Sequence, residues 1–293
     1  MATRWEVTTL ALIVVASGGW MGAAWLHPSI GIPLMAVATA LHSSLQHEAL
    51  HGHPTRNALV NEALVTWPLG VLIPYRRFRD THLAHHRNEA LTDPYDDPES
   101  HYFDPAVWSR LPYLAKMALR ANNTLAGRLV LGPAIGGLAF LRGEARLLAS
   151  GAPGVRLAWA IHAAALMPVL AWLAASPMPG WAAVLAIYAG HALLKIRTFL
   201  EHRAHDDPGA RSAIVEGGGP LAWLFLNNNL HALHHAHPKV AWYRLPALYR
   251  ARRAQVLRRN GGYAYRGYGE VFRRHLWRAK DPVPHPLMRE PEG

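Results

Sequence analysis

The stretch Asn227-Asn228-Asn229-Leu230-His231-Ala232-Leu233-His234-His235 places three histidines at positions i, i+3 and i+4. Residues at these spacings lie on the same face of an α-helix, so the three imidazoles can converge on one point. Imidazole is the commonest metal ligand among protein side chains. We therefore interpret this stretch as one part of a metal site around which the rest of the chain is organised.

Histidines recur at helical spacing elsewhere in the chain. His82, His85 and His86 repeat the i, i+3, i+4 pattern, His47 and His51 form an i, i+4 pair, and His202 follows Glu201. Together with the first stretch these make nine candidate ligands: His47, His51, His82, His85, His86, His202, His231, His234 and His235. A zinc ion takes three or four protein ligands, so the count indicates a centre with more than one ion. Imidazole suits iron, copper, zinc and nickel alike.

Composition excludes several kinds of protein. The chain has 293 residues, 51% of them hydrophobic, a formal net charge of +11 and no cysteine. The lack of cysteine excludes disulfides, thiolate-bound zinc and a cysteine-ligated iron–sulfur cluster. Basic soluble proteins of this kind usually bind nucleic acid, but here the apolar residues are gathered in long blocks. We therefore predict no nucleic-acid partner.

Four of these blocks approach the roughly 20 apolar residues that span a bilayer. They lie at about residues 7–26, 28–46, 157–175 and 181–199. The turns between paired blocks, 27–30 and 176–180, contain no Lys or Arg, whereas the segments after the second and fourth blocks hold nearly all of them. By the positive-inside rule, residues 47–156, residues 200–293 and both termini are cytosolic.

The fold expected from this pattern is an all-α integral membrane protein with residues 1–293 as a single domain. Four transmembrane helices form two hairpins, and a cytosolic helical cap holds a histidine-rich dimetal site. The apolar patch Leu129–Leu141 is too short to cross comfortably. A single extra crossing between His86 and His202 would also put the histidine groups on opposite sides, so we expect that this patch does not cross.

The combination of His-x3-His, His-x2-His-His and His-x2-His-His on a four-span chain resembles the membrane-bound fatty acid desaturase superfamily, whose relatives include alkane hydroxylases and carotenoid ketolases. The resemblance covers roughly residues 35–250. It implies that the eight boxed histidines are ligands of a di-iron centre, with His202 as the ninth ligand and His205 as its competitor. Asn88 and Asp93 match family habits as outer-shell or loop-capping groups.

Two further residues are candidates for catalytic roles. Glu201 precedes His202 as in the hydroxylase branch of the family, and Asn228 is suited to bond a ligand or a metal-bound water. Alternatively, Asn227, Asn228 and Asn229 only cap the helix that carries the third box.

The resemblance implies an enzyme that uses two iron ions and O2 to oxidise an unactivated C–H bond of an apolar, lipid-like substrate. A fatty acid desaturase is the first expectation, and a hydroxylase or ketolase of a hydrocarbon or carotenoid is the alternative. Electrons would come from an external ferredoxin, rubredoxin or similar carrier with its reductase. The arginine-rich segment 244–280 would dock that carrier or bind anionic membrane lipids. The expected location is the inner membrane of a bacterium, with the active site cytoplasmic.

Two rival classes remain open on the sequence. One is a haem-carrying electron-transfer protein that uses His42 and His191, which with His162 lie inside the predicted spans. The other is a metal transporter or sensor whose histidines bind metal without redox chemistry. The first leaves the boxes unexplained, and the second usually needs ionisable groups along a path at mid-membrane.

Overall fold

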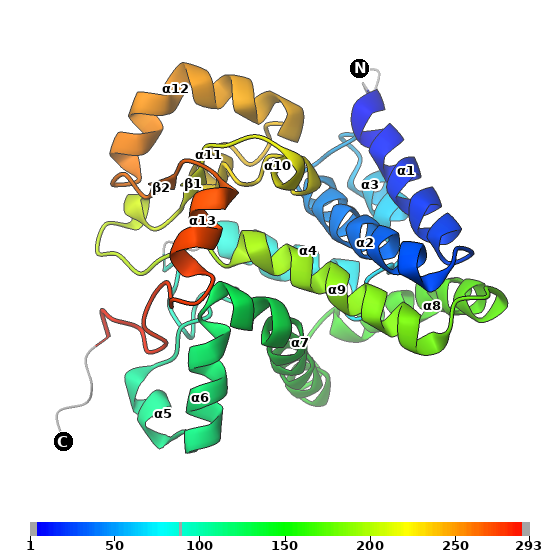
Figure 1. Ribbon diagram of the computed structural model, residues 1–293, viewed down its shortest axis with the longest axis horizontal. Helices are drawn as coiled ribbons and strands as arrows, with labels where there is room; N and C mark the ends of the chain where they lie inside the picture. The colour runs from blue at the N-terminus through cyan, green and yellow to red at the C-terminus, as the bar shows by residue number, and fades with distance from the viewer. Residues whose placement is uncertain (1–4, 88–89, 289–293) are drawn as a thin grey trace. The chain divides into compact units, whose positions relative to one another are not determined.

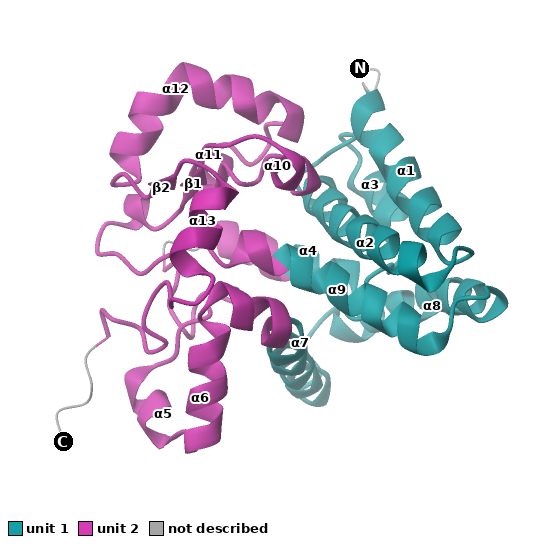
Figure 2. Ribbon diagram, viewed as in Figure 1, with its two compact units in different colours: residues 1–80, 133–194 teal, residues 81–132, 195–293 magenta. Residues whose placement is uncertain are grey.

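The computed structural model describes residues 5–87 and 90–288, and these ranges are mostly helical (Figure 1). Two compact units are built from alternating parts of the chain, unit 1 from residues 1–80 and 133–194 and unit 2 from residues 81–132 and 195–293 (Figure 2). Helices α4 (Tyr75–Arg87), α7 (Leu125–Ala149) and α9 (Gly180–Thr198) each begin in one unit and end in the other. The expectation that residues 1–293 form one domain stays a prediction.

Unit 1 is built on a helical hairpin. Its complete helices are α1 (Val7–Ala23), α2 (Pro28–Leu50), α3 (Ala58–Val65) and α8 (Val155–Ala175). The turn between α1 and α2 ends at His27, whose Nδ1 accepts a hydrogen bond from the Ser29 amide, and Pro28 opens α2. Proline suits this position because its missing N–H has no partner in the first turn of a helix.

Small residues allow the helices of unit 1 to pack closely. The core is rich in alanine, and Trp20 of α1 donates an Nε1 hydrogen bond of 3.1 Å to Thr39 Oγ1 of α2. A Cβ added at Gly190 of α9 would lie 2.6 Å from Thr39 Cβ and 3.0 Å from the carbonyl oxygen of Ala36. Such close approach of small residues is typical of helix packing in membranes, where it maximises van der Waals contact.

The predicted spans are confirmed as helices, with differences in length and hydropathy. Within the described residues, three helices are long and apolar enough to cross a membrane, namely α2, α7 and α8. Helix α1 is apolar but has 17 residues, and α9 carries Lys195 and Arg197 in its last turn and is not among the three. The four-span topology and the cytosolic cap therefore stay predictions.

The patch Leu129–Leu141 lies within a helix that is longer than the patch, and the expectation that it does not cross the membrane stays a prediction. Pro133 does not end the helix there, and α7 continues for 25 residues from Leu125 to Ala149. The helix extends past the apolar patch through Arg142, Glu144 and Arg146, and it is long and apolar enough to cross a membrane.

Unit 2 contains shorter elements. They are α5 (Pro105–Arg110), α6 (Tyr113–Asn122), α10 (Pro220–Leu224), α11 (His231–Ala236), α12 (Leu245–Arg259), α13 (Tyr268–His275), the 3-10 turns η1 (Pro208–Ala210) and η2 (Trp242–Arg244), and the strands β1 (Ile214–Val215) and β2 (Ala264–Tyr265). The strands pair in parallel, with Ile214 opposite Ala264. The fold is therefore mostly helical rather than all-α.

The core of unit 2 orients the third histidine box. Leu230 and Leu233 are buried against Ile214 of β1 and against Leu245 and Tyr249 of α12. Since α11 has only six residues, too few to be stable alone, this packing holds the helix in place. With its leucines buried in the core, α11 keeps a fixed orientation for its histidines.

The close approach at Gly190 generates a stability prediction. Gly190→Ala forces a methyl group against Thr39 and the Ala36 carbonyl, and overpacking of this kind costs about 1–3 kcal/mol, more than the roughly 1 kcal/mol that alanine gains over glycine in a helix. We expect a lower unfolding temperature for the detergent-solubilised protein, measured by intrinsic tryptophan fluorescence.

Gly143 of α7 is the matched control, since a Cβ added there meets nothing within 4 Å. Gly143→Ala should leave the unfolding temperature unchanged or raise it. Equal behaviour of the two variants would contradict the close packing described for Gly190.

Candidate metal centre

Unit 2 brings together seven of the nine predicted ligands from three separate segments. Helix α4 supplies His82, His85 and His86, helix α11 supplies His231, His234 and His235, and the segment after α9 supplies His202. His202 is fixed by an isolated bridge to Ser212, whose hydroxyl lies 3.2 Å from His202 Nδ1. The rings contact one another across these segments, as in the stacked pair of His86 and His235, whose centroids are 4.1 Å apart.

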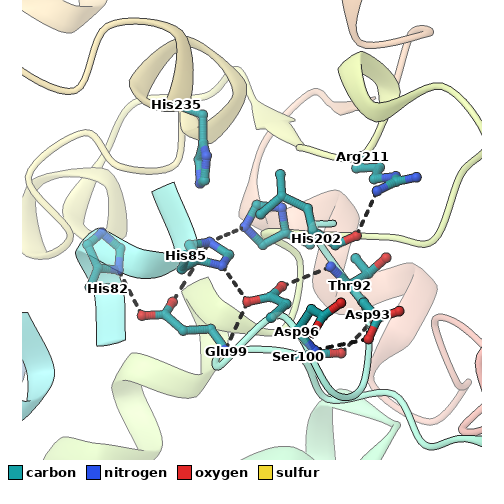
Figure 3. Close-up of polar contacts among 12 residues, drawn as sticks. His82, His85, Thr92, Asp93, Asp96, Glu99, Ser100, His202, Arg211 and His235 are labelled. Carbon is teal, nitrogen blue, oxygen red and sulfur yellow. Dashed lines mark hydrogen bonds and ion pairs between the residues drawn. The ribbon is translucent and has the colours of Figure 1, made fainter. Parts of the chain in front are cut away.

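Four of the rings form one group of converging nitrogens. His85, His202, His231 and His235 each offer one nitrogen within 4.8 Å of the others. His202 Nε2 lies 2.9 Å from His85 Nε2 and 3.0 Å from His231 Nε2, which in turn lies 3.0 Å from His235 Nε2. Figure 3 shows His85 and His202 facing each other.

The other three rings of unit 2 form a second group. His82, His86 and His234 also offer nitrogens within 4.8 Å of one another, and the Nε2 atoms of His86 and His234 are 3.1 Å apart. The two groups are neighbours, because His82, His85 and His86 occupy one helix. This arrangement places two candidate ion positions side by side, each lined by imidazole.

In three of the rings the outer nitrogen, Nδ1, has an oxygen partner, and this explains why the inner nitrogen, Nε2, which faces other rings, suits a metal. His85 Nδ1 lies 2.7 Å from the Asp97 carboxylate, His82 Nδ1 lies 2.8 Å from Glu99, and His231 Nδ1 lies 3.2 Å from Asn228 Oδ1. An oxygen acceptor on Nδ1 requires a proton there, which leaves Nε2 of a neutral ring with a lone pair. Lone pairs that face one another cannot hydrogen-bond, whereas a cation placed among them satisfies all of them. The residues present therefore fit a metal centre.

Burial favours the neutral, metal-binding form of most of these imidazoles. It lowers the pKa of His86 to about 3 and holds the pKa values of His202, His231 and His235 well below the ordinary value. For His85, burial also acts to lower the pKa, but the hydrogen bond to Asp97 and the charge of Glu99 outweigh it and raise the pKa.

His47 and His51 belong to unit 1 and are described separately. His47 lies in the last turn of α2, and His51 is the residue that caps the helix at its C-terminal end. Both are buried, and their ring centroids are 4.8 Å apart. The i, i+4 spacing thus brings the two rings together as expected, and their role as ligands stays a prediction.

His202, and not His205, lies among the converging nitrogens. His205 Nδ1 instead accepts a hydrogen bond of 3.1 Å from the Asp207 amide in a turn. Glu201, directly before His202, is buried and pairs at 2.8 Å with Arg197, with one oxygen 3.5 Å from His231 Nδ1. Burial raises the pKa of the Glu201 carboxyl although Arg197 acts in the opposite direction.

The three asparagines before α11 do not cap it, so that alternative was wrong. The N-cap residue is Leu230, and its side chain makes no cap hydrogen bond. Asn227 donates to the Trp242 carbonyl at 3.1 Å and Asn229 donates to the Val215 carbonyl at 2.6 Å. Asn228 alone reaches a predicted ligand, His231.

Other groups at the site escaped the sequence reasoning. Asp97 and Glu99 contact ligand rings, and Lys280 donates a hydrogen bond of 2.8 Å to the carbonyl oxygen of His202. The acidic run Asp93-Pro-Tyr-Asp-Asp-Pro-Glu99 was the available signal for the two carboxylates. Asp93 caps this loop by accepting the amides of Tyr95 and Asp96, and Asn88 lies outside the described residues.

Two of the histidines inside the predicted spans have structural partners. His191 Nε2 bonds the Gly70 carbonyl and His162 Nε2 bonds the Val71 carbonyl, each at 2.8 Å. These bonds satisfy carbonyls of a non-helical segment of unit 1, where Val71 has φ 63°. Both rings therefore have a structural role in unit 1, and the haem alternative is not tested by these bonds.

Comparison with known proteins agrees with this geometry. The family model described as fatty acid desaturase matches residues 23–267. A beta-carotene ketolase of Paracoccus sp. (strain N81106 / MBIC 01143) is 27% identical over 251 residues, which cover 83% of this chain and 83% of the ketolase. A beta-carotene ketolase of Paracoccus sp. (strain PC1) is 28% identical over 248 residues, covering 80% and 86% of the two chains.

The contrast between His202 and His205 gives a test of the site. His202→Ala removes a nitrogen from the group of four, and we expect metal affinity to fall by at least about 10- to 100-fold, the loss typical of even an outer-shell change. His205→Ala should bind metal as the native protein does. Metal per chain, measured by elemental analysis of the detergent-purified protein, distinguishes them, and a loss caused by His205→Ala alone would reverse the assignment.

Proposed function

Because this chain belongs to the fatty acid desaturase family, we propose that it is an integral membrane oxidoreductase that uses two iron ions and O2 to oxidise a C–H bond of an apolar substrate. The observation that carries the proposal is the convergence of seven buried or half-buried imidazoles in unit 2, with lone pairs directed at two adjacent positions. A structural role alone would not favour lone pairs that face one another.

All nine histidines are proposed as ligands. His85, His202, His231 and His235 hold one ion, and His82, His86 and His234 contribute to the other, for which the sequence pattern adds His47 and His51. When bound, reduced iron supplies the activation of O2 needed to attack an unactivated C–H bond. The protein orients the ligand rings through their outer nitrogens and keeps water away by burying them.

Asn228 and Glu201 are proposed to act beside the ions. Asn228 Oδ1 holds His231 in the tautomer that presents Nε2, and its amide is placed to bond a ligand or a metal-bound water. Glu201 is a buried carboxyl beside His231 and His202. Burial raises its pKa although Arg197 acts in the opposite direction, and a carboxyl in this position can donate or accept a proton beside the ligands.

Oxygen insertion is the outcome that the comparisons favour. Both relatives reported above carry the name beta-carotene ketolase, and each aligns over four fifths or more of this chain. Conversion of a methylene group to a ketone takes two successive oxidations, each of which consumes O2, two electrons and two protons and releases water. The substrate is then a carotenoid or a similarly apolar molecule. Desaturation of a fatty acyl chain is the second candidate, favoured by the description of the family model.

The partners follow from this chemistry. An apolar substrate enters from the bilayer, and electrons come from an external ferredoxin, rubredoxin or similar carrier with its reductase. Helix α12 carries exposed arginines at positions 250, 252, 253, 258 and 259, which suit an acidic carrier. Anionic membrane lipids are the other partner for this basic surface. We place the active site on the cytoplasmic side of a bacterial inner membrane.

A direct test expresses the protein in cells that accumulate β-carotene. Native protein should yield products that have gained oxygen with loss of two hydrogens, detected by liquid chromatography and mass spectrometry, and the purified protein should contain about two irons per chain. His234→Ala should reduce product by more than about 100-fold, since it removes a proposed ligand and not merely an outer partner.

His285→Ala is the control for this experiment. His285 lies in unit 2 but contacts Thr92 Oγ1 at 3.3 Å and belongs to neither nitrogen group. It should retain product formation and metal content. Native protein that contains a single zinc or no metal would contradict the proposed function, and a lipid profile with new double bonds would favour the second candidate.

A further inference from the structure

The acidic loop between α4 and α5 carries two carboxylates, and each lies within hydrogen-bond distance of a different proposed ligand. Asp97 Oδ1 lies 2.7 Å from His85 Nδ1. Glu99 Oε1 lies 2.8 Å from His82 Nδ1, and Glu99 Oε2 lies 3.9 Å from His85 Nε2 (Figure 3). His85 belongs to the group of four nitrogens and His82 to the other group. One short loop therefore contacts a ligand of each proposed ion.

The backbone of the loop is built to hold Asp97 still. Asp97 Oδ2 accepts the amide of Thr92 at 2.8 Å, and Oδ1 also accepts the amide of Glu99 at 2.9 Å. Ser100 Oγ closes the loop by donating to the Thr92 carbonyl at 2.7 Å. A carboxylate fixed by two backbone amides on one side and an imidazole on the other has little freedom to leave His85.

The loop is also attached to the segment that follows His202. Arg211 Nη1 donates to the Leu91 carbonyl at 3.0 Å, and its Nε donates to the His205 carbonyl at 2.8 Å. The support of His85 and the chain that carries His202 are thereby connected. These two rings face each other at 2.9 Å, so the attachment connects the supports of two rings that are in contact.

The two carboxylates differ in their exposure to solvent. The Asp97 side chain is 1% exposed, whereas the Glu99 side chain is 29% exposed. A buried charge that loses its partner is costly, whereas a partly solvated one is screened by water. Loss of Asp97 should therefore disturb its ligand more than loss of Glu99 disturbs His82.

We propose that Asp97 and Glu99 are positioning residues that fix the Nδ1–H tautomer and the ring orientation of His85 and His82, so that one loop controls the affinity of both ions. The inference rests on the proposed function for the identity of the ligands. A carboxylate on the outer nitrogen of a ligating histidine also makes the ring a stronger base, and its loss typically costs about 10- to 100-fold in metal affinity.

The test measures metal binding rather than turnover. Full-length apo-protein in detergent is titrated with Co2+ under anaerobic conditions, followed by visible absorption, and bound cobalt per chain is measured by elemental analysis. We expect the native protein to bind two ions. The Glu99→Gln variant should bind one of them about 10- to 100-fold more weakly, and the Asp97→Asn variant should bind the other more weakly by at least as much. The double variant should bind both ions more weakly.

Asp96→Asn is the matched control, because it removes one negative charge from an exposed position of the same loop. It should bind both ions as the native protein does. Equal loss in Asp96→Asn and Glu99→Gln would show that only the charge of the loop matters and would overturn the inference.

The unfolding temperature of each apo-variant separates positioning from folding. Glu99→Gln should leave it unchanged, since Glu99 is partly exposed. If Asp97→Asn lowers it and loses both ions together, Asp97 has a general structural role and its part of the inference fails. If the native protein binds two ions and the Asp97 and Glu99 variants bind them equally well, the inference fails but the proposed function stands. If the native protein binds no ion, the proposed function fails as well.

Discussion

Unit 2 depends on a single electrostatic constraint, which is that imidazole lone pairs buried side by side need a cation between them. Asp97 and Glu99 place protons on the outer nitrogens of two rings, so the inner nitrogens become acceptors that face other nitrogens. Uncompensated acceptors in a buried site cost free energy. A cation among these nitrogens would relieve this cost, so the histidines of α4, α11 and the segment of His202 form groups that fit bound metal.

The same contacts limit the topology in a membrane. The rings of His85 and His202 touch, so both lie on one side of the bilayer. The chain between them must then cross an even number of times, and it contains three apolar helices, α7, α8 and α9. An even number of crossings leaves either one or all three of these helices outside the bilayer. Length and composition favour α7 and α8 as spans, whereas the absence of basic residues from the turn between α8 and α9 favours that hairpin.

Supports for the ligands come from loops rather than from the helices that carry them. Asp97 and Glu99 follow α4, Asn228 precedes α11, and Lys280 from near the C-terminus holds the carbonyl of His202. Leu226 and Asn227, both at positive φ, shape the turn before α11. Strained backbone of this kind persists only where the surrounding contacts fix it, and here the turn delivers Asn228 to His231.

The sequence by itself determined the histidine boxes, the apolar runs and the family. Period and run length are local properties, and the spacing of His82, His85 and His86 on α4 expresses them directly. The apolar run Leu129–Leu141 could not determine the full length of α7, because the helix continues beyond the run at both ends through charged residues. The local pattern also could not choose His202 over His205, because the contact that distinguishes them is with His85, 117 positions away in the chain. It could not find Asp97 either, because the folded loop brings that carboxylate to His85. Such contacts are decided by tertiary structure, because the energy of a buried polar group depends on which partners the whole fold brings to it.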